Sequence, residues 1–152
     1  MENKLHAFMV EWTINFVKNK DLVSKKIEKI EKGKEGFDLY VKYKGKEQYF
    51  IILPSDLLNS FKGLKDDSYF SIVLLNSAEN LSFVLKNWYK FASFKSLSVI
   101  FVNPFSSSDK KWILYPHTHN KICDESSLET GLKSMFEMVG PADEQQTISR
   151  IG

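Results

Sequence analysis

The sequence predicts a three-layer α/β sandwich, in which a mixed β-sheet is covered by helices on both faces. Three largely apolar runs indicate this class, because strands covered on both faces carry no regular polar alternation. They are YFIIL at 49–53, YFSIVLL at 69–75 and LSVIFV at 97–102. The last two flank a segment of helical periodicity, and a strand, helix and strand in this order form a parallel crossover unit.

The chain is expected to begin with a helix over residues 5–18. Apolar residues recur there at helical spacing and give the helix a broad face for packing on a sheet. They include Leu5, Phe8, Met9, Trp12 and Phe16. Residues 22–30 fit either a helix or a strand, and we predict a strand because the segment is short and is followed by two glycines.

A β-hairpin that leads into a helix is expected next, over residues 37–53. Alternate residues of its first arm are apolar, as in a strand with one buried face. A Lys-Gly-Lys turn at 44–46 precedes the second strand. Pro54 ends that strand, and Ser55 can cap a helix over residues 56–64.

The second half of the chain adds two helices and a short strand. A single helix is expected over 77–91, capped by Ser77. Residues 112–115 form a short edge strand, because a proline follows them. Ser126 and Glu129 have the spacing of a capping box and predict a last helix that ends at a Gly-Pro pair.

The chain is expected to form one domain over residues 1–140, followed by a flexible tail over 141–152. A length of 152 residues suits one domain with its own core. The tail has few apolar residues, and such chain ends are commonly mobile.

Composition predicts a cytoplasmic globular protein without a membrane segment. Hydrophobic residues make up 43% of the chain, which is too many for a disordered protein. The single cysteine excludes an internal disulfide, and the sequence begins without a signal-like apolar run. The longest apolar runs are too short to cross a bilayer.

Lysine is concentrated between residues 18 and 46, although the net charge is only +2. Lys42, Lys44 and Lys46 in the hairpin are candidate nucleic-acid contacts. Of the 21 basic residues only Arg150 is an arginine, the side chain that reads bases by bidentate hydrogen bonds. Weak, sequence-independent binding is therefore favoured over sequence-specific reading, and a solvated surface is the simpler interpretation of the lysines.

The order of elements, with Gly-Phe-Asp at the start of the second strand and a Lys-Gly-Lys turn before the third, resembles the restriction-endonuclease-like nuclease superfamily. The resemblance implies that Asp38 stands where that superfamily has a metal-binding Asp. Glu11 on the first helix could match an extra acid found in some members. These two residues are the candidate polar site.

The resemblance also implies that the nuclease chemistry is lost. The Glu-x-Lys pair of the superfamily would fall near Ile52 and Pro54, which cannot bind a cation. We therefore predict no catalytic residues, no metal and no cofactor. Asp38 is expected to be an exposed residue on the solvent side of its strand.

His117, His119 and Asp124 are candidate metal ligands. Two histidines separated by one residue share a side of an extended segment, and an acid and Cys123 follow closely. The spacing matches no standard motif, so a surface turn is the favoured interpretation. A metal-dependent hydrolase centred on these three residues is the alternative.

The function predicted from sequence is a non-catalytic binding or scaffold protein on a degenerate nuclease-like fold, and an enzyme is disfavoured. Its partner would be nucleic acid or another protein, with no membrane involved. A third hypothesis is a structural subunit that forms homo-oligomers through the exposed edge strand at 112–115.

Overall fold

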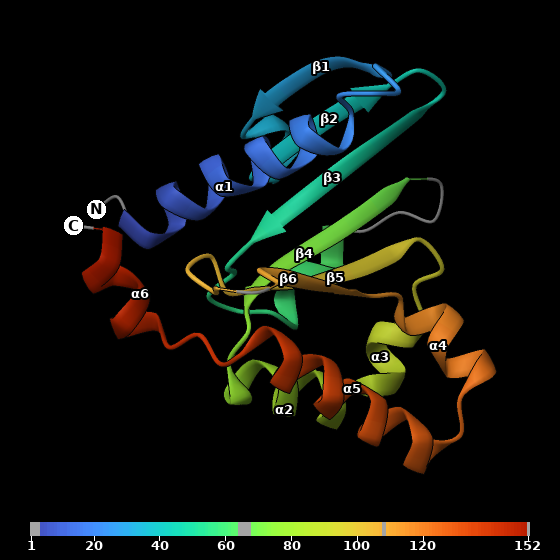
Figure 1. Ribbon diagram of the computed structural model, residues 1–152. Coiled ribbons are helices and arrows are strands. Elements are labelled where there is room, and N and C mark those ends of the chain that lie inside the picture. The colour runs from blue at the N-terminus through green and yellow to red at the C-terminus, as the bar shows by residue number, and fades with distance from the viewer. Residues whose placement is uncertain (1–3, 64–67, 108, 152) are drawn as a thin grey trace.

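The computed structural model describes residues 4–63, 68–107 and 109–151 (Figure 1). Most strands lie in the first two thirds of the chain, and the last three elements are helices. In order, the helices and strands are α1 (Lys4–Lys20), β1 (Ile27–Lys32), the short 3-10 helix η1 (Lys34–Gly36), β2 (Leu39–Tyr43), β3 (Lys46–Ile52), the 3-10 helix η2 (Asn59–Gly63), β4 (Tyr69–Leu75), α2 (Ala78–Lys86), α3 (Trp88–Ala92), β5 (Leu97–Val102), β6 (Lys111–Leu114), α4 (Pro116–Ile122), α5 (Glu125–Val139) and α6 (Glu144–Ile151).

The six strands form one mixed sheet in the order β1-β2-β3-β4-β5-β6. The first three strands are an antiparallel meander, whereas β3, β4 and β5 run parallel. Strand β6 pairs antiparallel with β5 and forms one edge. The predicted α/β class and mixed sheet are confirmed.

Helices cover both faces of the sheet (Figure 1). Helices α1 and α6 pack on one face, here called the α1 face. Helices α2, α3 and α5 pack on the other, here called the α5 face. The strand residues buried on the α1 face are Leu39, Val41, Phe50, Ile52, Val73, Leu75, Ile100 and Val102. No helix among the described residues is long and apolar enough to span a membrane.

The strand expected at 22–30 begins later than predicted, at Ile27. The carboxylate of Asp21 accepts hydrogen bonds from the backbone N–H groups of Lys26 and Ile27, at 2.8 and 2.9 Å. These bonds hold the segment before β1 in a turn, because an Asp side chain competes with the backbone for its donors.

The helix expected at 56–64 is wrong for the part that is described. Bends lead there into η2, and residue 64 lies outside the described residues. Asp56 Oδ1 accepts from the backbone N–H of Asn59 at 3.1 Å, and the Ser60 hydroxyl donates to the carbonyl of Leu57. Such local side-chain bonds favour turns over a continuing α-helix.

The helix expected at 77–91 is two helices, α2 and α3, which are separated at Asn87. The Asn87 side-chain amide donates to the carbonyl of Phe83 at 2.9 Å, and its backbone leaves the helical region. The predicted Ser77 cap is confirmed, because its hydroxyl accepts from the backbone N–H of Asn80 at 3.1 Å.

Helix α5 begins one residue before the predicted capping box. Asp124 is the cap, with Oδ1 accepting from the backbone N–H of Ser127 at 2.8 Å. The Ser126 hydroxyl donates to the same carboxylate at 3.1 Å. The capping role of Ser126 and Glu129 is therefore wrong, since the preceding Asp already satisfies the first turn.

The tail expected to be flexible, 141–152, instead contains helix α6, which packs against α1. Thr147 is buried, and Ile148 and Ile151 pack on the core of the α1 face. Few apolar residues suffice here because they share one side of the helix. Residue 152 lies outside the described residues.

The ring of Phe105 connects α1 with α6. It stacks on Phe8 of α1 with a centroid separation of 5.7 Å. The guanidinium of Arg150 in α6 lies 5.7 Å from the same ring. The beginning of α1 and the end of α6 therefore lie beside one loop residue.

A buried amide at the end of β4 joins four segments of the chain. Asn76 is fully buried, and its Nδ2 donates to the carbonyls of Phe136 at 3.1 Å and Gly140 at 2.8 Å. Its Oδ1 accepts from Trp112 Nε1 at 2.8 Å. Its backbone carbonyl accepts from the N–H of Ala142 at 2.8 Å. Every side-chain hydrogen of this amide thus has an acceptor, as burial requires.

We expect Asn76→Asp to lower the free energy of unfolding by roughly 3 kcal/mol at neutral pH. A carboxylate oxygen would then face the two carbonyls that now accept hydrogen bonds from the Asn76 amide. Urea denaturation measures the change. Asn15→Asp on the exposed side of α1 is the matched control and should have little effect. The loss should shrink at acidic pH, where the introduced carboxyl is protonated; a loss below about 1 kcal/mol would contradict the role assigned to Asn76.

Candidate functional site

The two acids of the predicted polar site do not come together. Asp38 is half-buried, with Oδ1 2.9 Å from His6 Nε2 and Oδ2 accepting from the backbone N–H of Ile52 at 2.7 Å. The expected exposed position of Asp38 is therefore wrong. Glu11 forms an exposed ion pair with Lys32 at 2.6 Å. Asp38 joins α1 to the end of β3, whereas Glu11 faces β1.

Ile52, near which the resemblance would place a metal-binding Glu, is a core residue of the protein. Ile52 has only 1% of its surface exposed and belongs to the core of the α1 face. In the described parts of the chain, no group of three or more His, Cys, Asp or Glu side chains is placed to hold a metal ion. At this end of the sheet, Asp38 links α1 to the backbone of β3 through His6 and Ile52.

His117, His119 and Asp124 do not converge either. The histidines lie on helix α4, where residues two apart point to different sides, so the assumption of an extended segment was wrong. His117 Nδ1 lies 2.9 Å from the carbonyl of Ala92, and His119 Nδ1 lies 2.9 Å from that of Tyr115. Hydrogen bonds from Ser127 and Ser126 hold the pKa of Asp124 below its usual value. Its carboxylate is a helix cap.

The three hairpin lysines point to different surfaces. Lys42 lies on the α5 face of β2, and its ammonium is 3.9 Å from Glu28. Lys46 lies on the α1 face of β3, and Lys44 is in the turn. Because side chains of a strand alternate between faces, a run of lysines in sequence becomes two surfaces in space.

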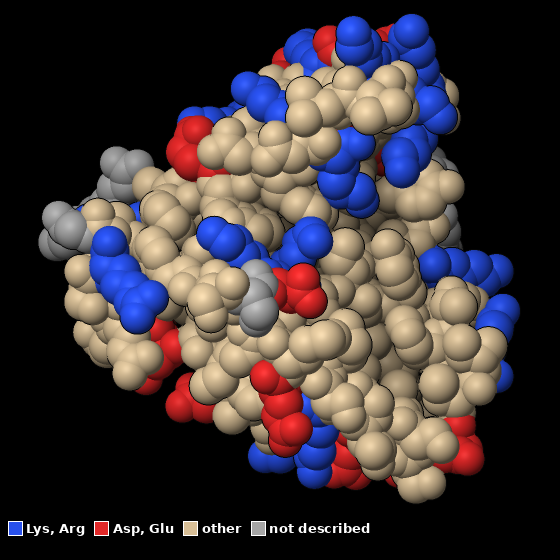
Figure 2. Space-filling view, in the orientation of Figure 1, with Lys and Arg blue, Asp and Glu red and all other residues tan. Residues whose placement is uncertain are grey.

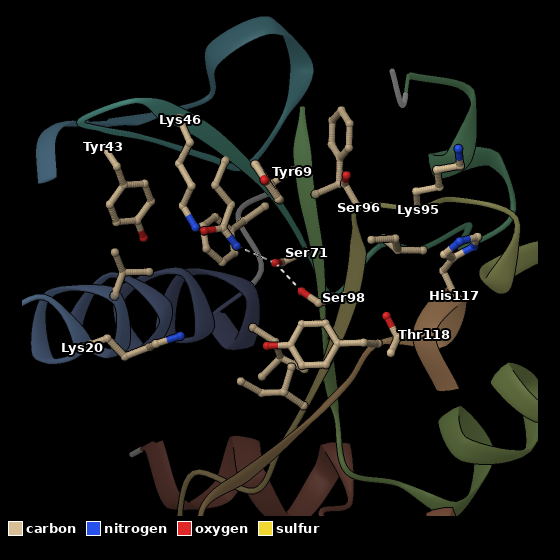
Figure 3. Close-up of a pocket in the computed structure, with 18 of the residues that line it drawn as sticks. Lys20, Tyr43, Lys46, Tyr69, Ser71, Lys95, Ser96, Ser98, His117 and Thr118 are labelled. Carbon is tan, nitrogen blue, oxygen red and sulfur yellow. Dashed lines mark hydrogen bonds between the residues drawn. The ribbon is translucent and has the colours of Figure 1, made fainter. Parts of the chain in front are cut away.

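A cavity opens on the α1 face beyond the C-terminal end of α1, with a volume of about 260 Å³ (Figure 3). Its floor is the beginning of strands β4 and β5. Lys20 of α1 and Lys46 of β3 approach it from one side, and Lys95 and His117 line the other. Its inner end is closed by the core residues Val17, Phe50 and Ile100, each at most 2% exposed.

The cavity is positively charged. Lys20, Lys46 and Lys95 line it, and no Asp or Glu among the described residues does. None of the three forms an ion pair with any residue that the structure describes. Partial burial and the nearby charges of Lys46 and Lys111 lower the pKa of Lys20. Figure 2 shows lysine atoms gathered, with some acidic atoms among them, over the upper part of the molecule, where Figure 1 places the first three strands.

Polar residues form a row across the floor of the cavity, where neighbouring positions of the same face are apolar. Gln48 Nε2 donates to Ser71 Oγ at 2.7 Å, and Ser71 Oγ lies 2.7 Å from Ser98 Oγ (Figure 3). Ser71 and Ser98 are paired directly in the strand register. Ser71 is fully buried, whereas Ser98 is partly exposed to the cavity.

Tyrosine rings surround the mouth of the cavity. Tyr69 and Tyr115 are 47% and 50% exposed, and Tyr43 is half-buried. The ammonium of Lys46 lies 5.0 Å from the ring of Tyr69 and 5.1 Å from that of Tyr43. Burial and the charge of Asp21 raise the pKa of Tyr43, so this phenol is neutral at physiological pH. Exposed rings beside unpaired cations suit a ligand that carries both an anion and a flat ring.

A second cavity of about 450 Å³ adjoins the first and shares Lys20, Tyr43 and Lys46 with it. Asp21 also lines this second cavity. Its hydrogen bonds to Ile27, Lys26 and Ser24 hold its pKa below the usual value against the opposing effect of desolvation. A carboxylate there makes the first cavity the better place for an anion.

Some residues of this basic cavity could be predicted from the sequence. Lys20 and Lys46 belong to the basic segment recognised from composition, but Lys95, Tyr69 and Tyr115 were not connected with it. Ser71 and Ser98 are polar residues that interrupt two apolar strands at corresponding positions, a signal that could have indicated the floor. No family model, curated protein or solved structure matches the chain.

We expect Lys20→Gln to raise the free energy of unfolding at low salt by about 0.5 kcal/mol or less, because it removes a partly desolvated charge beside other lysines. Thermal denaturation measures the shift. Because the pKa of Lys20 is lowered in the folded state, the folded protein loses this proton at a lower pH than the unfolded chain does. The stability of the parent protein should therefore rise relative to the variant as the pH rises towards the unfolded pKa of lysine.

Lys133→Gln is the control, since Lys133 pairs with Glu129 at 3.0 Å on the other side of the sheet and should give no gain. Added salt should reduce the gain at position 20 by screening the repulsion among the lysines. Destabilisation by Lys20→Gln would show that this ammonium has a stabilising partner.

Proposed function

We propose that this protein is a non-catalytic binding protein that holds single-stranded nucleic acid at the basic cavity. The observation that carries the proposal is a group of lysines around a cavity that is lined by no acid from the part of the chain that the structure describes, where these lysines also have no carboxylate partner. Lys20, Lys46 and Lys95 supply charge for phosphates, and contacts of this kind are independent of sequence. The near absence of arginine agrees with binding that does not read bases.

The exposed tyrosines favour a single strand over a duplex. Bases of a single strand can stack on an aromatic ring, whereas bases of a duplex are already stacked and paired. Tyr69 and Tyr115 are exposed at the cavity and close to the cationic side chains. An alternation of phosphate contacts and ring contacts is the usual arrangement for sequence-tolerant single-strand binding.

The fold proposed for this function is a degenerate restriction-endonuclease-like domain. An N-terminal helix, an antiparallel meander and a parallel crossover support that resemblance. Asp38 is engaged by His6 and the backbone of Ile52, and Ile52 supplies no cation ligand. Binding without cleavage is therefore the function that the geometry supports best.

We expect a fluorescent oligonucleotide of about 10 nucleotides to bind at about 50 mM salt and to lose most of its affinity by about 200 mM. Lys46→Glu should weaken binding roughly tenfold, because it reverses a charge at the cavity. Lys42→Glu is a matched control in the same hairpin, with its side chain on the opposite face. Fluorescence anisotropy measures both variants. Equal losses for the two would contradict the proposed surface, and absence of binding at low salt would favour the structural-subunit hypothesis.

We expect no cleavage of DNA or RNA by the protein in Mg²⁺ or Mn²⁺, since one engaged carboxylate does not hold a divalent cation. Gel electrophoresis of labelled substrates after long incubation is the measurement. Cleavage that disappears in Asp38→Ala would overturn the proposal of lost chemistry. Cleavage that persists in that variant would indicate a contaminating nuclease.

A further inference from the structure

The hydrogen bonds along the polar row on the floor of the cavity run in one direction. Ser71 accepts a hydrogen bond from Gln48, and its buried hydroxyl proton needs an acceptor of its own. Ser98 Oγ is the acceptor within reach, at 2.7 Å. The hydrogen bonds therefore run from Gln48 to Ser71 to Ser98.

This direction leaves the Ser98 proton free. No residue in the described chain accepts it, and Ser98 is partly exposed on the cavity floor. The row ends in a hydrogen-bond donor that faces the cavity, and Lys20 and Lys46 line the same cavity from the side of α1 and β3 (Figure 3). A donor beside cations is matched by an oxygen-rich anion.

His117 uses only one of its two ring nitrogens in a hydrogen bond with the described part of the chain. Its Nδ1 lies 2.9 Å from the carbonyl of Ala92, and since a carbonyl only accepts, Nδ1 carries a proton. Nε2 has no hydrogen-bond partner among the residues described. His117 lines the wall opposite Lys20 and Lys46.

The cavity is closed at its inner end, which limits what can enter. Val17, Phe50 and Ile100 are packed core residues, so a chain cannot pass through, and a terminal group can enter more deeply than a phosphate inside a strand. A terminal phosphate monoester carries close to two negative charges at neutral pH, whereas a phosphate inside a strand carries one. A site with several lysines and no acid favours the doubly charged group.

We propose that the cavity is a phosphate-monoester site, in which Ser98, Lys20 and Lys46 bind the terminal phosphate of a nucleotide while a base stacks on an exposed tyrosine at the mouth. This proposal names the chemical group that the cavity binds. It rests on the proposed function where it assumes that the phosphate belongs to a nucleic-acid strand. The phosphate could belong to the end of a nucleic-acid strand or to a free mononucleotide, and the two sources are distinguished by experiment.

The test compares two oligothymidylates of equal length, one with a 5′-phosphate and one with a 5′-hydroxyl, and adds thymidine monophosphate as a separate ligand. We expect the phosphorylated strand to bind roughly tenfold more tightly to the parent protein, as one charged hydrogen bond and the added charge imply. Ser98→Ala and Lys46→Gln should each remove most of that preference. Ser82→Ala, an exposed serine on α2 beyond the opposite face of the sheet, should keep it.

The outcomes separate the inference from the proposed function. Equal affinity for both strands, or a preference that Ser98→Ala retains, would overturn the phosphate-monoester site and leave strand binding in place. Binding of thymidine monophosphate without binding of either strand would support the site and overturn the nucleic-acid proposal. If no ligand binds at low salt, both are overturned. Circular dichroism and the melting temperature of each variant establish that it is folded.

Discussion

The amide of Asn76 is the interaction on which the arrangement of the C-terminal third depends. A buried primary amide must satisfy both of its hydrogens, and here their acceptors are the carbonyls that end α5. The oxygen of the same amide holds Trp112, which stacks on Phe101 with a centroid separation of 4.3 Å. One side chain thus orients β6 against β5 and fixes where the chain crosses from the α5 face to the α1 face. Helix α6 can pack on α1 only because that crossing is fixed.

The cavity exists because α1 covers only part of its face of the sheet. Where the helix lies over the strands, the inward positions are Phe50, Val73 and Ile100, and their burial stabilises the fold. Beyond the end of the helix the same face carries Gln48, Ser71 and Ser98. These polar positions do not contribute apolar burial, and the lysines around them repel one another. A surface that reduces stability in this way is typical of a binding site.

Much of the fold was predictable because its signals are local. Largely apolar runs identify buried strands, and all three such runs lie in the central strands of the sheet. The errors came from competing local bonds, as at Ser60, and from the period assumed for His117 and His119. The candidate site was less predictable, since a lysine run cannot reveal which members share a face without a strand register. Lys20 and the beginnings of β4 and β5 line one cavity only because distant segments pair in the sheet, and no single-sequence pattern encodes that pairing.

The ring of Phe105, in contact with both α1 and α6, places the two chain ends together at one pole of the molecule (Figure 1). The cavity lies at the other end of α1, whose 17 residues span about 25 Å. A tether attached through either end would therefore present the cavity outward from a sensor surface.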